Sequence, residues 1–458
     1  MVDTLDPANL DAVFKAYDVR GLVTEQLDEQ LARATGRAFV RVVGADTVVV
    51  GHDMRPSSPG MAGAFADGAS EAGADVVLIG LASTDQLYFA SGSLGLPGAM
   101  FTASHNPAQY NGIKMCRAGA TPIGMETGLA EIRDAVAAGA ASVGTRQGSI
   151  DEHDVLEAYA AHLLTLAPVT GRRLKVVVDA GNGMAGYTAP AVFGRLGERQ
   201  VELVPMYFEL DGTFPNHEAN PIEPANLADL QRRVVSEGAD IGLAFDGDAD
   251  RCFLVDERGR AVSPSTLTAL IAARELAKEP GATVIHNLIT SRAVPEIVTE
   301  LGGTPVRTRV GHSYIKATMA ETGAIFGGEH SGHFYFRDFW RADSGMLAAL
   351  HALAALAETD RPLSALLAEY ERYVVSGEIN STVADQAGAA AAVEAAYAGR
   401  DGVSTDHLDG LSVSHADWAF NVRPSNTEPL LRLNAEGRDQ ATMAEVRDAV
   451  LTIIRSDR

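Results

Sequence analysis

The chain is 458 residues long, which is more than a single hydrophobic core holds, so several domains are expected. Hydrophobic residues make up 46% of it and charged residues 21%, as in ordinary globular proteins. The formal net charge of -23 argues against nucleic acid or an anionic membrane as a partner. Two cysteines make no disulfide framework, and no signal peptide or bilayer-spanning apolar run is recognised, so a cytoplasmic location is expected.

Strand and helix patterns alternate along the first 368 residues. Short apolar runs predict strands, and the longer stretches between them predict helices. Strand–helix–strand units at this spacing are typical of parallel sheets, and the pattern passes through the chain three times. The expected strands are 47–51, 75–79, 99–101, 175–179, 201–206, 241–245, 252–255, 283–286 and 304–307, and the expected helices are 25–43, 58–72, 151–167, 225–237, 264–277, 291–301 and 343–357.

The composition changes near residue 371, and a different kind of domain is expected from there on. Strands at 373–384, 411–416, 418–422 and 430–435, with helices at 389–398 and 440–455, predict an α+β domain. The fold class is therefore α/β, with three similar α/β domains of mixed, mainly parallel sheets and a C-terminal α+β domain. The expected domain ranges are 1–150, 151–258, 259–368 and 369–458.

Three carboxylates, Asp246, Asp248 and Asp250, alternate with small residues after the strand at 241–245. In a tight loop such side chains converge on one point, and a set of oxygen donors favours a hard divalent cation such as Mg²⁺. Two alternatives are a solvated acidic turn and an EF-hand calcium loop, whose twelfth position would be Glu257. The EF-hand needs Gly at its sixth position, where Arg251 stands, and it needs flanking helices where strands are expected.

Three other polar loops follow expected strands or lie between them, at 102–107, 328–333 and 423–429. Ligands in open α/β sheets bind beyond the carboxyl ends of strands, which makes the first loop, with Ser104, a candidate site. The loop that starts at Arg423 offers hydrogen-bond donors suited to a phosphate. The glycine-rich turn at 180–186 is compatible with a phosphate cradle and equally with close helix–sheet packing.

These loops and the aspartate loop, in this order and spacing, make essentially the whole chain resemble the α-D-phosphohexomutase family, which contains phosphomannomutases, phosphoglucomutases and phosphoglucosamine mutases. The resemblance implies a heart-shaped enzyme with a central cleft to which each domain contributes one loop. It also implies that Ser104 carries a phosphoryl group and binds one Mg²⁺ together with Asp246, Asp248 and Asp250. It assigns catalytic roles to Ser104, Arg20, His105, Lys114, Arg251, His312 and His333, and substrate binding to Tyr17, Glu329, Ser331, Arg423, Ser425, Asn426 and Thr427.

The sequence Gly-Glu-His-Ser-Gly-His at 328–333 is similar to the phosphomannomutase and dual-specificity branch of that family. The implied activity is the interconversion of mannose 6-phosphate and mannose 1-phosphate through a hexose 1,6-bisphosphate. Action on glucose phosphates is expected as well. The expected oligomeric state is a monomer or a dimer. Two positions depart from the family: Ile289 stands where some bacterial relatives have Lys, and Ala249 stands where many have Gly, which narrows the allowed backbone.

Other functions remain open on the sequence alone. Within the family, the main activity could be that of a phosphoglucomutase or a phosphoglucosamine mutase. A phosphatase or phosphotransferase could use the same serine and cation. From another class, the chain could be a non-catalytic sugar-phosphate sensor on the same scaffold.

Overall fold

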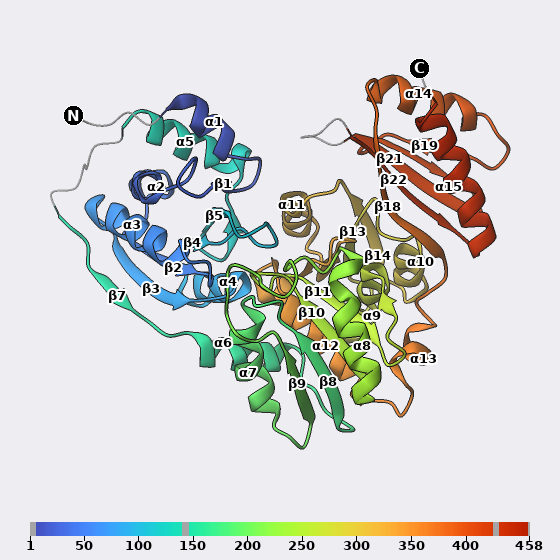
Figure 1. Ribbon diagram of the computed structural model, residues 1–458, viewed down its shortest axis with the longest axis horizontal. Helices are drawn as coiled ribbons and strands as arrows, with labels where there is room; N and C mark the ends of the chain where they lie inside the picture. Colours follow the sequence, from blue (N-terminus) through green and yellow to red (C-terminus); the bar gives the residue numbers. More distant parts are fainter. Residues whose placement is uncertain (1–5, 140–145, 425–429, 457–458) are drawn as a thin grey trace. The chain divides into compact units, whose positions relative to one another are not determined.

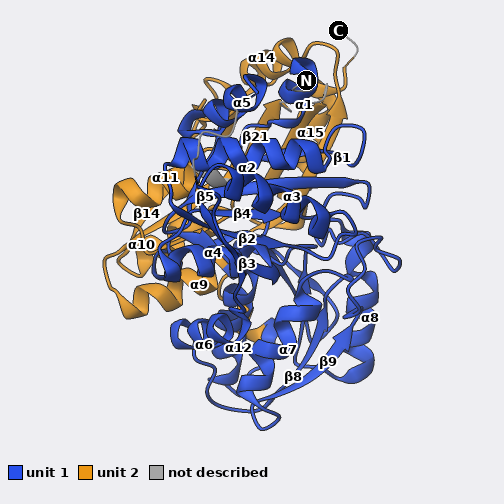
Figure 2. Cartoon of the chain, turned by 90° about the vertical axis from the view of Figure 1, so that its left-hand side faces the viewer, with its two compact units in different colours: residues 1–267, 331–364 blue, residues 268–330, 365–458 orange. Residues whose placement is uncertain are grey.

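The computed structural model describes residues 6–139, 146–424 and 430–456. The chain folds into two compact units (Figure 2). Unit 1 comprises Met1–Leu267 and Ser331–Ser364, and unit 2 comprises Thr268–His330 and Ala365–Arg458. Among the helices of the described part, none has both the length and the apolar character needed to cross a membrane.

The elements of unit 1 are labelled in Figure 1. Its helices are α1 (Pro7–Val13), α2 (Glu29–Val43), α3 (Ser58–Glu71), α4 (Thr84–Leu94), η1 (Met125–Thr127), α5 (Leu129–Ala137), α6 (Leu156–Leu166), α7 (Ala185–Leu196), η2 (Pro224–Leu227), α8 (Ala228–Glu237), η3 (Arg337–Phe339) and α12 (Gly345–Ala357). Its strands are β1 (Val19–Leu22), β2 (Thr47–His52), β3 (Asp75–Leu81), β4 (Gly98–Phe101), β5 (Tyr110–Arg117), β6 (Thr121–Pro122), β7 (Ile150–Glu152), β8 (Leu174–Asp179), β9 (Val201–Met206), β10 (Ile241–Phe245), β11 (Cys252–Asp256), β12 (Ala261–Val262), β16 (Phe334–Phe336) and β17 (Ala342–Asp343).

The elements of unit 2 include two helices, α9 (Pro264–Lys278) and α13 (Leu363–Leu367), that contain a unit boundary. Its other helices are α10 (Ala293–Glu300), α11 (His312–Thr322), α14 (Gln386–Tyr397) and α15 (Gln440–Ile454), and its strands are β13 (Thr283–Asn287), β14 (Thr304–Thr308), β15 (Phe326–Gly328), β18 (Val374–Thr382), β19 (Ser404–Asp406), β20 (Leu411–Ser414), β21 (Trp418–Pro424) and β22 (Leu430–Gly437).

The first sheet of unit 1 has the strand order β1-β5-β4-β2-β3-β7, with β6 beside β5. Strands β4, β2, β3 and β7 run parallel, whereas β5 is antiparallel to β4 and to β1. The core beneath it is apolar and includes Phe39, Phe65 and Phe101, all fully buried. The burial of such side chains is the main force that holds these elements together.

The second sheet of unit 1 has the order β12-β11-β10-β8-β9. Strands β10, β8 and β9 run parallel, and β11 returns antiparallel to β10 after a short turn. All five residues of β10 are buried, which fits a strand covered on both faces. The turn between β10 and β11 carries the three aspartates, so they lie at the carboxyl end of the central parallel strands.

Unit 2 contains two different sheets. Strands β14, β13 and β15 are parallel neighbours. The C-terminal sheet, in the order β18-β22-β21-β20-β19, is antiparallel throughout. Helices α14 and α15 pack on one face of it over a core that includes Val413, Phe420 and Leu433 (Figure 1). The α+β character predicted for this segment is what the structure shows.

The predicted elements agree with the structure except at a few boundaries. The helix expected from residue 25 begins at Glu29, because the Asp28 side chain accepts a hydrogen bond from Leu31 N and caps it. The helix expected from 151 begins at Leu156, because Ile150–Glu152 instead pairs with β3. Several elements were not predicted at all, among them the helices α1, α4, α5, α11 and α13 and the strands β1, β5 and β19.

Candidate active site

Ser104 lies on the loop that follows β4. Its backbone φ is +49°, a left-handed conformation that residues other than glycine rarely adopt. The side chain is 5% exposed, and its Oγ donates a hydrogen bond to Asp246 Oδ2 at 2.8 Å. The Nδ1 atom of His105 lies 3.2 Å from the same Oγ. A nearly buried serine in an unusual conformation, beside a carboxylate and an imidazole, is a candidate catalytic residue.

Arg55 fixes the loop that carries Ser104. The Arg55 side chain is buried, and its Nε lies 3.3 Å from the equally buried carboxylate of Asp53. Its guanidinium donates hydrogen bonds to the backbone carbonyl oxygens of Ser104, Asn106, Pro107 and Tyr110, at 3.0, 2.6, 2.9 and 2.9 Å. Arg55 was not predicted as a site residue. The sequence feature that pointed to Arg55 is its place in a polar run directly after β2. The Ser104 loop has the same place after β4.

The three aspartates between β10 and β11 form a buried cluster. Their side chains are at most 1% exposed, and one ligand atom from each lies within 4.8 Å of the others. Asp248 Oδ1 and Asp250 Oδ1 are buried and accept no hydrogen bond within the described part of the chain. Buried carboxylate oxygens without partners fit a cation, which would satisfy them. The strands on both sides contradict the EF-hand alternative.

Two cationic side chains contact the aspartate cluster. Lys114 on β5 donates to Asp248 Oδ2 at 2.7 Å and to Asp250 Oδ2 at 2.6 Å. Arg251 Nε donates to Asp246 Oδ2 at 2.8 Å, while its Nη2 is buried and has no partner among the described residues. A guanidinium nitrogen of this kind is available to a phosphate oxygen.

Burial and neighbouring charges shift the pKa values of the side chains in this cluster in opposite directions. Burial raises the pKa of Asp246, even though the Arg251 guanidinium favours its carboxylate form. Burial also opposes ionisation of Asp248, but the Lys114 ammonium outweighs it and lowers the pKa of Asp248. Burial, together with the charge of Arg251, holds the pKa of His105 well below its usual range. Uneven pKa shifts among neighbouring groups are typical of functional sites.

The Ser104 loop and the aspartate loop are closely packed on each other. A Cβ at Gly247 would lie 2.4 Å from the carbonyl oxygen of Ser104, so a residue with a side chain would push the two loops apart. At the start of α4, Thr84 Oγ1 donates to Asp248 Oδ2 at 2.5 Å, and Thr84 N donates to Asp248 O at 3.0 Å. Thr84 is a second contact residue that the sequence analysis missed.

His333 and Ser331 lie beside the aspartate loop in unit 1. His333 forms an isolated antiparallel bridge with Arg251, and its Nε2 lies 3.5 Å from Asp250 Oδ1. Ser331 Oγ lies 3.1 Å from His333 Nδ1. The Nε2 atom is also 3.8 Å from Asp343 Oδ2, a third residue that the sequence analysis did not identify.

Arg20 on β1 contacts the other end of the Ser104 loop. Its guanidinium donates to Asn106 Oδ1 at 2.5 Å, to Asp18 Oδ2 at 2.5 Å and to the carbonyl of Ala103 at 3.4 Å. Tyr17 is half-buried on the segment between α1 and β1. Unit 1 therefore brings together most of the predicted catalytic residues around Ser104 and the aspartates.

The remaining predicted residues belong to unit 2. Glu329 is 2% exposed, and its Oε1 accepts hydrogen bonds from Asn287 Nδ2 at 3.2 Å and from Gly311 N at 3.3 Å. Arg423 is on β21, with its Nη1 3.9 Å from Asp409 Oδ2. His312 is the first residue of α11. Ser425, Asn426 and Thr427 lie outside the described residues.

The glycine-rich turn at 180–186 is explained by close packing. A Cβ at Gly183 would lie 2.7 Å from the carbonyl oxygen of Gly247, and one at Gly186 would lie 2.4 Å from that of Phe208. This turn therefore supports the aspartate loop from the start of α7. Of the two interpretations that the sequence left open, the packing one accounts for both glycines.

Comparison with known proteins assigns four consecutive segments to one family. The models that describe phosphoglucomutase/phosphomannomutase α/β/α domains I, II and III match residues 11–142, 157–259 and 263–373, and that of the C-terminal domain matches 378–453. A phosphomannomutase of Salmonella montevideo is 42% identical over 441 residues, covering 95% of this chain and 96% of the relative. The chain belongs to the phosphoglucomutase/phosphomannomutase family.

Other members of the phosphoglucomutase/phosphomannomutase family give the same result. A protein of Xanthomonas campestris pv. campestris named "Phosphohexose mutases" is 42% identical over 437 residues, 95% of this chain and 97% of the relative. The crystal structure of a family protein from Burkholderia thailandensis superimposes with a TM-score of 0.87 at 36% identity, covering 97% of this chain and 98% of that one. The predicted fold class of three α/β domains and a different C-terminal domain is thereby confirmed.

Ala249, in the middle of the aspartate loop, has a strained backbone. Its φ is +60°, which costs a residue with a Cβ about 1–2 kcal/mol, while glycine pays about 0.5–1 kcal/mol of extra chain entropy. We expect Ala249→Gly to stabilise the aspartate loop locally by up to about 1 kcal/mol, measured by hydrogen exchange of the amides at 246–252 with a chelator present. The control is Ala244→Gly on β10, whose φ is not positive and which should destabilise. Equal losses in both variants would contradict the strain at Ala249.

Proposed function

We propose that this family member interconverts mannose 6-phosphate and mannose 1-phosphate through a phosphoserine at Ser104 and a hexose 1,6-bisphosphate, and that it also acts on glucose phosphates. The observation that carries the proposal is the 2.8 Å contact between Ser104 Oγ and Asp246, in a chain about 40% identical to proteins named phosphomannomutase. A phosphorylated Ser104 would place its charge beside Lys114, Arg251 and the aspartate cluster.

The aspartates suit a hard cation. Asp246, Asp248 and Asp250 offer only carboxylate oxygens, two of them buried without partners, and such a donor set favours Mg²⁺ over softer metals. Together with an oxygen of phosphorylated Ser104, these three residues would hold it. When bound, Mg²⁺ would supply positive charge that stabilises the transferring phosphoryl group.

The side chains around Ser104 have distinct proposed tasks. The hydroxyl of the bound sugar monophosphate attacks the phosphorus, and the bond from phosphorus to Ser104 Oγ breaks. His105, with Nδ1 3.2 Å from Oγ, is placed to exchange a proton there. Arg251 Nη2 and Lys114 Nζ neutralise negative charge on the phosphoryl oxygens. The sugar hydroxyl must lose a proton, and His333 is a candidate acceptor.

Residues of unit 2 are proposed, from the family resemblance, to bind the rest of the substrate. Glu329, together with Ser331 of unit 1, would contact sugar hydroxyls, and His312 is a further acid or base candidate. Arg423, with Ser425, Asn426 and Thr427, would bind the phosphate that does not react. After the first transfer the bisphosphate turns end for end, so the Arg423 loop accepts either phosphate in turn. Three further points stay predictions. They are activation by hexose 1,6-bisphosphate, the contribution of one loop by each of four domains, and a cytoplasmic location as a monomer or dimer.

The experiment that tests this function compares three substrates side by side. We expect mannose 1-phosphate to give the highest kcat/KM, glucose 1-phosphate to be converted as well, and glucosamine 1-phosphate to be the poorest. Glucose 1,6-bisphosphate should prime the reaction, and inorganic phosphate should stay a trace product because exclusion of water protects the phosphoserine. A preference for glucosamine 1-phosphate, or stoichiometric release of inorganic phosphate, would overturn the proposal.

A further inference from the structure

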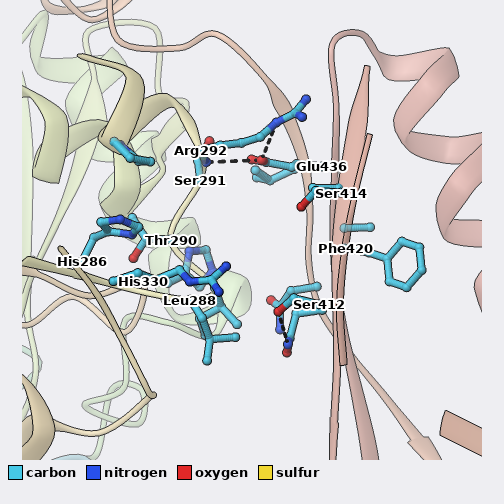
Figure 3. A pocket seen from close by; sticks show the side chains of 18 of the residues that line it. His286, Leu288, Thr290, Ser291, Arg292, His330, Ser412, Ser414, Phe420 and Glu436 are labelled. Carbon is cyan, nitrogen blue, oxygen red and sulfur yellow. Dashed lines mark hydrogen bonds and ion pairs between the residues drawn. The ribbon is translucent and has the colours of Figure 1, made fainter. Parts of the chain in front are cut away.

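Unit 2 contains a pocket that none of the assigned roles uses (Figure 3). It has a cavity of about 140 Å³ and lies between the segment 286–295, which runs from the end of β13 into α10, and one face of the C-terminal sheet. His330 also lines it, whereas Glu329 and Arg423, to which substrate binding is assigned, do not. The pocket is therefore built from residues outside the predicted site, apart from its border with the loop at 328–333.

The pocket wall on the C-terminal sheet is polar because of strand alternation. In β20 and β21, Val413 and Phe420 point into the apolar core under α14 and α15. Their neighbours Ser412, Ser414 and Asn421 face the opposite way. Figure 3 shows the hydroxyls of Ser412 and Ser414 on the pocket side of the sheet and the Phe420 ring on the other side. The face of the sheet opposite α14 and α15 therefore carries hydrogen-bonding groups.

Three polar atoms on this wall have unmet hydrogen bonds. Asn421 and Asn434 stand directly opposite each other on β21 and β22, and Glu436 lies two residues beyond Asn434. Asn421 Oδ1, Asn434 Nδ2 and Glu436 Oε2 are buried, and no partner for them exists within the described residues. Such groups are rare in folded proteins because each costs about 1–3 kcal/mol unless water or a ligand satisfies it.

Three charged side chains line the pocket, Arg292, Arg307 and Glu436, and each of them lies in an ion pair. Glu436 Oε1 accepts from Arg292 N at 3.2 Å and lies 3.1 Å from Arg292 Nε, so this carboxylate is already paired. Arg307 donates to Asp406. Burial lowers the pKa of His286 to about 4, which leaves its imidazole neutral near pH 7. An anion such as phosphate would meet the Glu436 carboxylate, so an uncharged ligand fits better.

We propose that this pocket is a second binding site, which takes an uncharged, hydroxyl-bearing ring such as a monosaccharide or a cyclic polyol. Ligand hydroxyls would donate to Glu436 Oε2 and Asn421 Oδ1 and accept from Asn434 Nδ2. The apolar groups of Leu288, Ile289 and other lining residues would contact the carbon atoms of the ring. A cavity of roughly 150 Å³ is known to hold benzene, so about 140 Å³ accommodates the six ring atoms of such a ligand.

The test uses the whole chain with myo-inositol and D-mannose as probes and inorganic phosphate as a charged comparison. Binding is followed by saturation-transfer NMR in the presence of saturating mannose 1-phosphate, which blocks the sugar-phosphate site if the proposed function is right. We expect at least one ring compound to bind without displacement by the sugar phosphate, and an excess of inorganic phosphate to leave the saturation-transfer signal of that ring compound unchanged. Loss of one hydrogen bond in Asn434→Ala should raise the Kd about five-fold.

The matched control is Asn380→Ala, which removes an exposed amide from β18 of the same sheet, outside the pocket. It should change the Kd less than about two-fold, as surface substitutions usually do. If Asn434→Ala does not fold, Ala419→Leu, which fills the cavity from β21, should abolish binding instead. Absence of binding by both rings, displacement by the sugar phosphate, or equal affinity in the pocket variants and the control would overturn the proposal. The Kd of the ring compound in Asn434→Ala or Ala419→Leu, compared with that in Asn380→Ala, tests the pocket whether or not the mutase assignment holds.

Discussion

Ser104→Ala should abolish phosphoryl incorporation and reduce kcat by at least about a thousand-fold, because a covalent route loses its nucleophile. The fold should survive. Alanine has the same backbone limits as serine at a φ of +49°. Within the described part of the chain, the Ser104 Oγ atom contacts Asp246 and His105, and the variant gives up these two contacts. The measurements are kcat with mannose 1-phosphate and intact mass after incubation with glucose 1,6-bisphosphate.

The control for this variant is Ser331→Ala. Ser331 Oγ lies 3.1 Å from His333 Nδ1, and sugar binding is the role assigned to this residue, so the variant should still take up one phosphoryl group while its KM changes. Near wild-type turnover in Ser104→Ala would end the covalent account. Loss of phosphoryl incorporation in both variants would show that the effect is not specific to Ser104.

Arg55→Met should loosen the Ser104 loop and cost about 3–5 kcal/mol of local stability, because it leaves the buried carboxylate of Asp53 without its cation. Four backbone carbonyl oxygens also lose a donor. A chain of several domains does not unfold as one two-state system, so hydrogen exchange of the amides at 102–110 is the appropriate measurement. Turnover should fall together with the protection.

Two comparison variants sharpen the Arg55 experiment. Arg33→Met breaks a half-exposed pair with Asp67 and Glu71 and should cost no more than about 1 kcal/mol. The double variant Asp53→Asn/Arg55→Met removes the stranded charge and should be less damaging than Arg55→Met alone. If exchange at 102–110 is the same in wild type and Arg55→Met, Arg55 does not hold the loop.

The sequence predicted the strands and the loops that carry the site, because their signals are local. Ser104 and the aspartates follow short apolar runs, which became β4 and β10. The proximity of Ser104 to Asp246, 142 residues apart, was not a local signal and came only from the family resemblance. The structure supplies the physical reason: both loops leave the carboxyl ends of parallel strands, and Gly247 lets them touch.

What the sequence analysis missed depends on tertiary contacts. A lone arginine after a strand is indistinguishable from a surface charge until its four carbonyl partners are seen, as with Arg55. Helix α4 was missed because burial extends around it, so it lacks the amphipathic period. Because Thr84 is the first residue of α4, its hydrogen bond to Asp248 was missed as well. For Ala249, the sequence predicted only that the allowed backbone conformations are fewer than for glycine. It did not predict the left-handed conformation that the structure shows.

The most direct test of the central claim is the location of the phosphoryl group. The protein is incubated with glucose 1,6-bisphosphate, digested and analysed by mass spectrometry before and after addition of excess mannose 1-phosphate. We predict one phosphate on the peptide that contains Ser104, and its transfer to the sugar as a hexose 1,6-bisphosphate. Turnover with Ser104 never modified, or with the phosphate on another residue, would contradict the account.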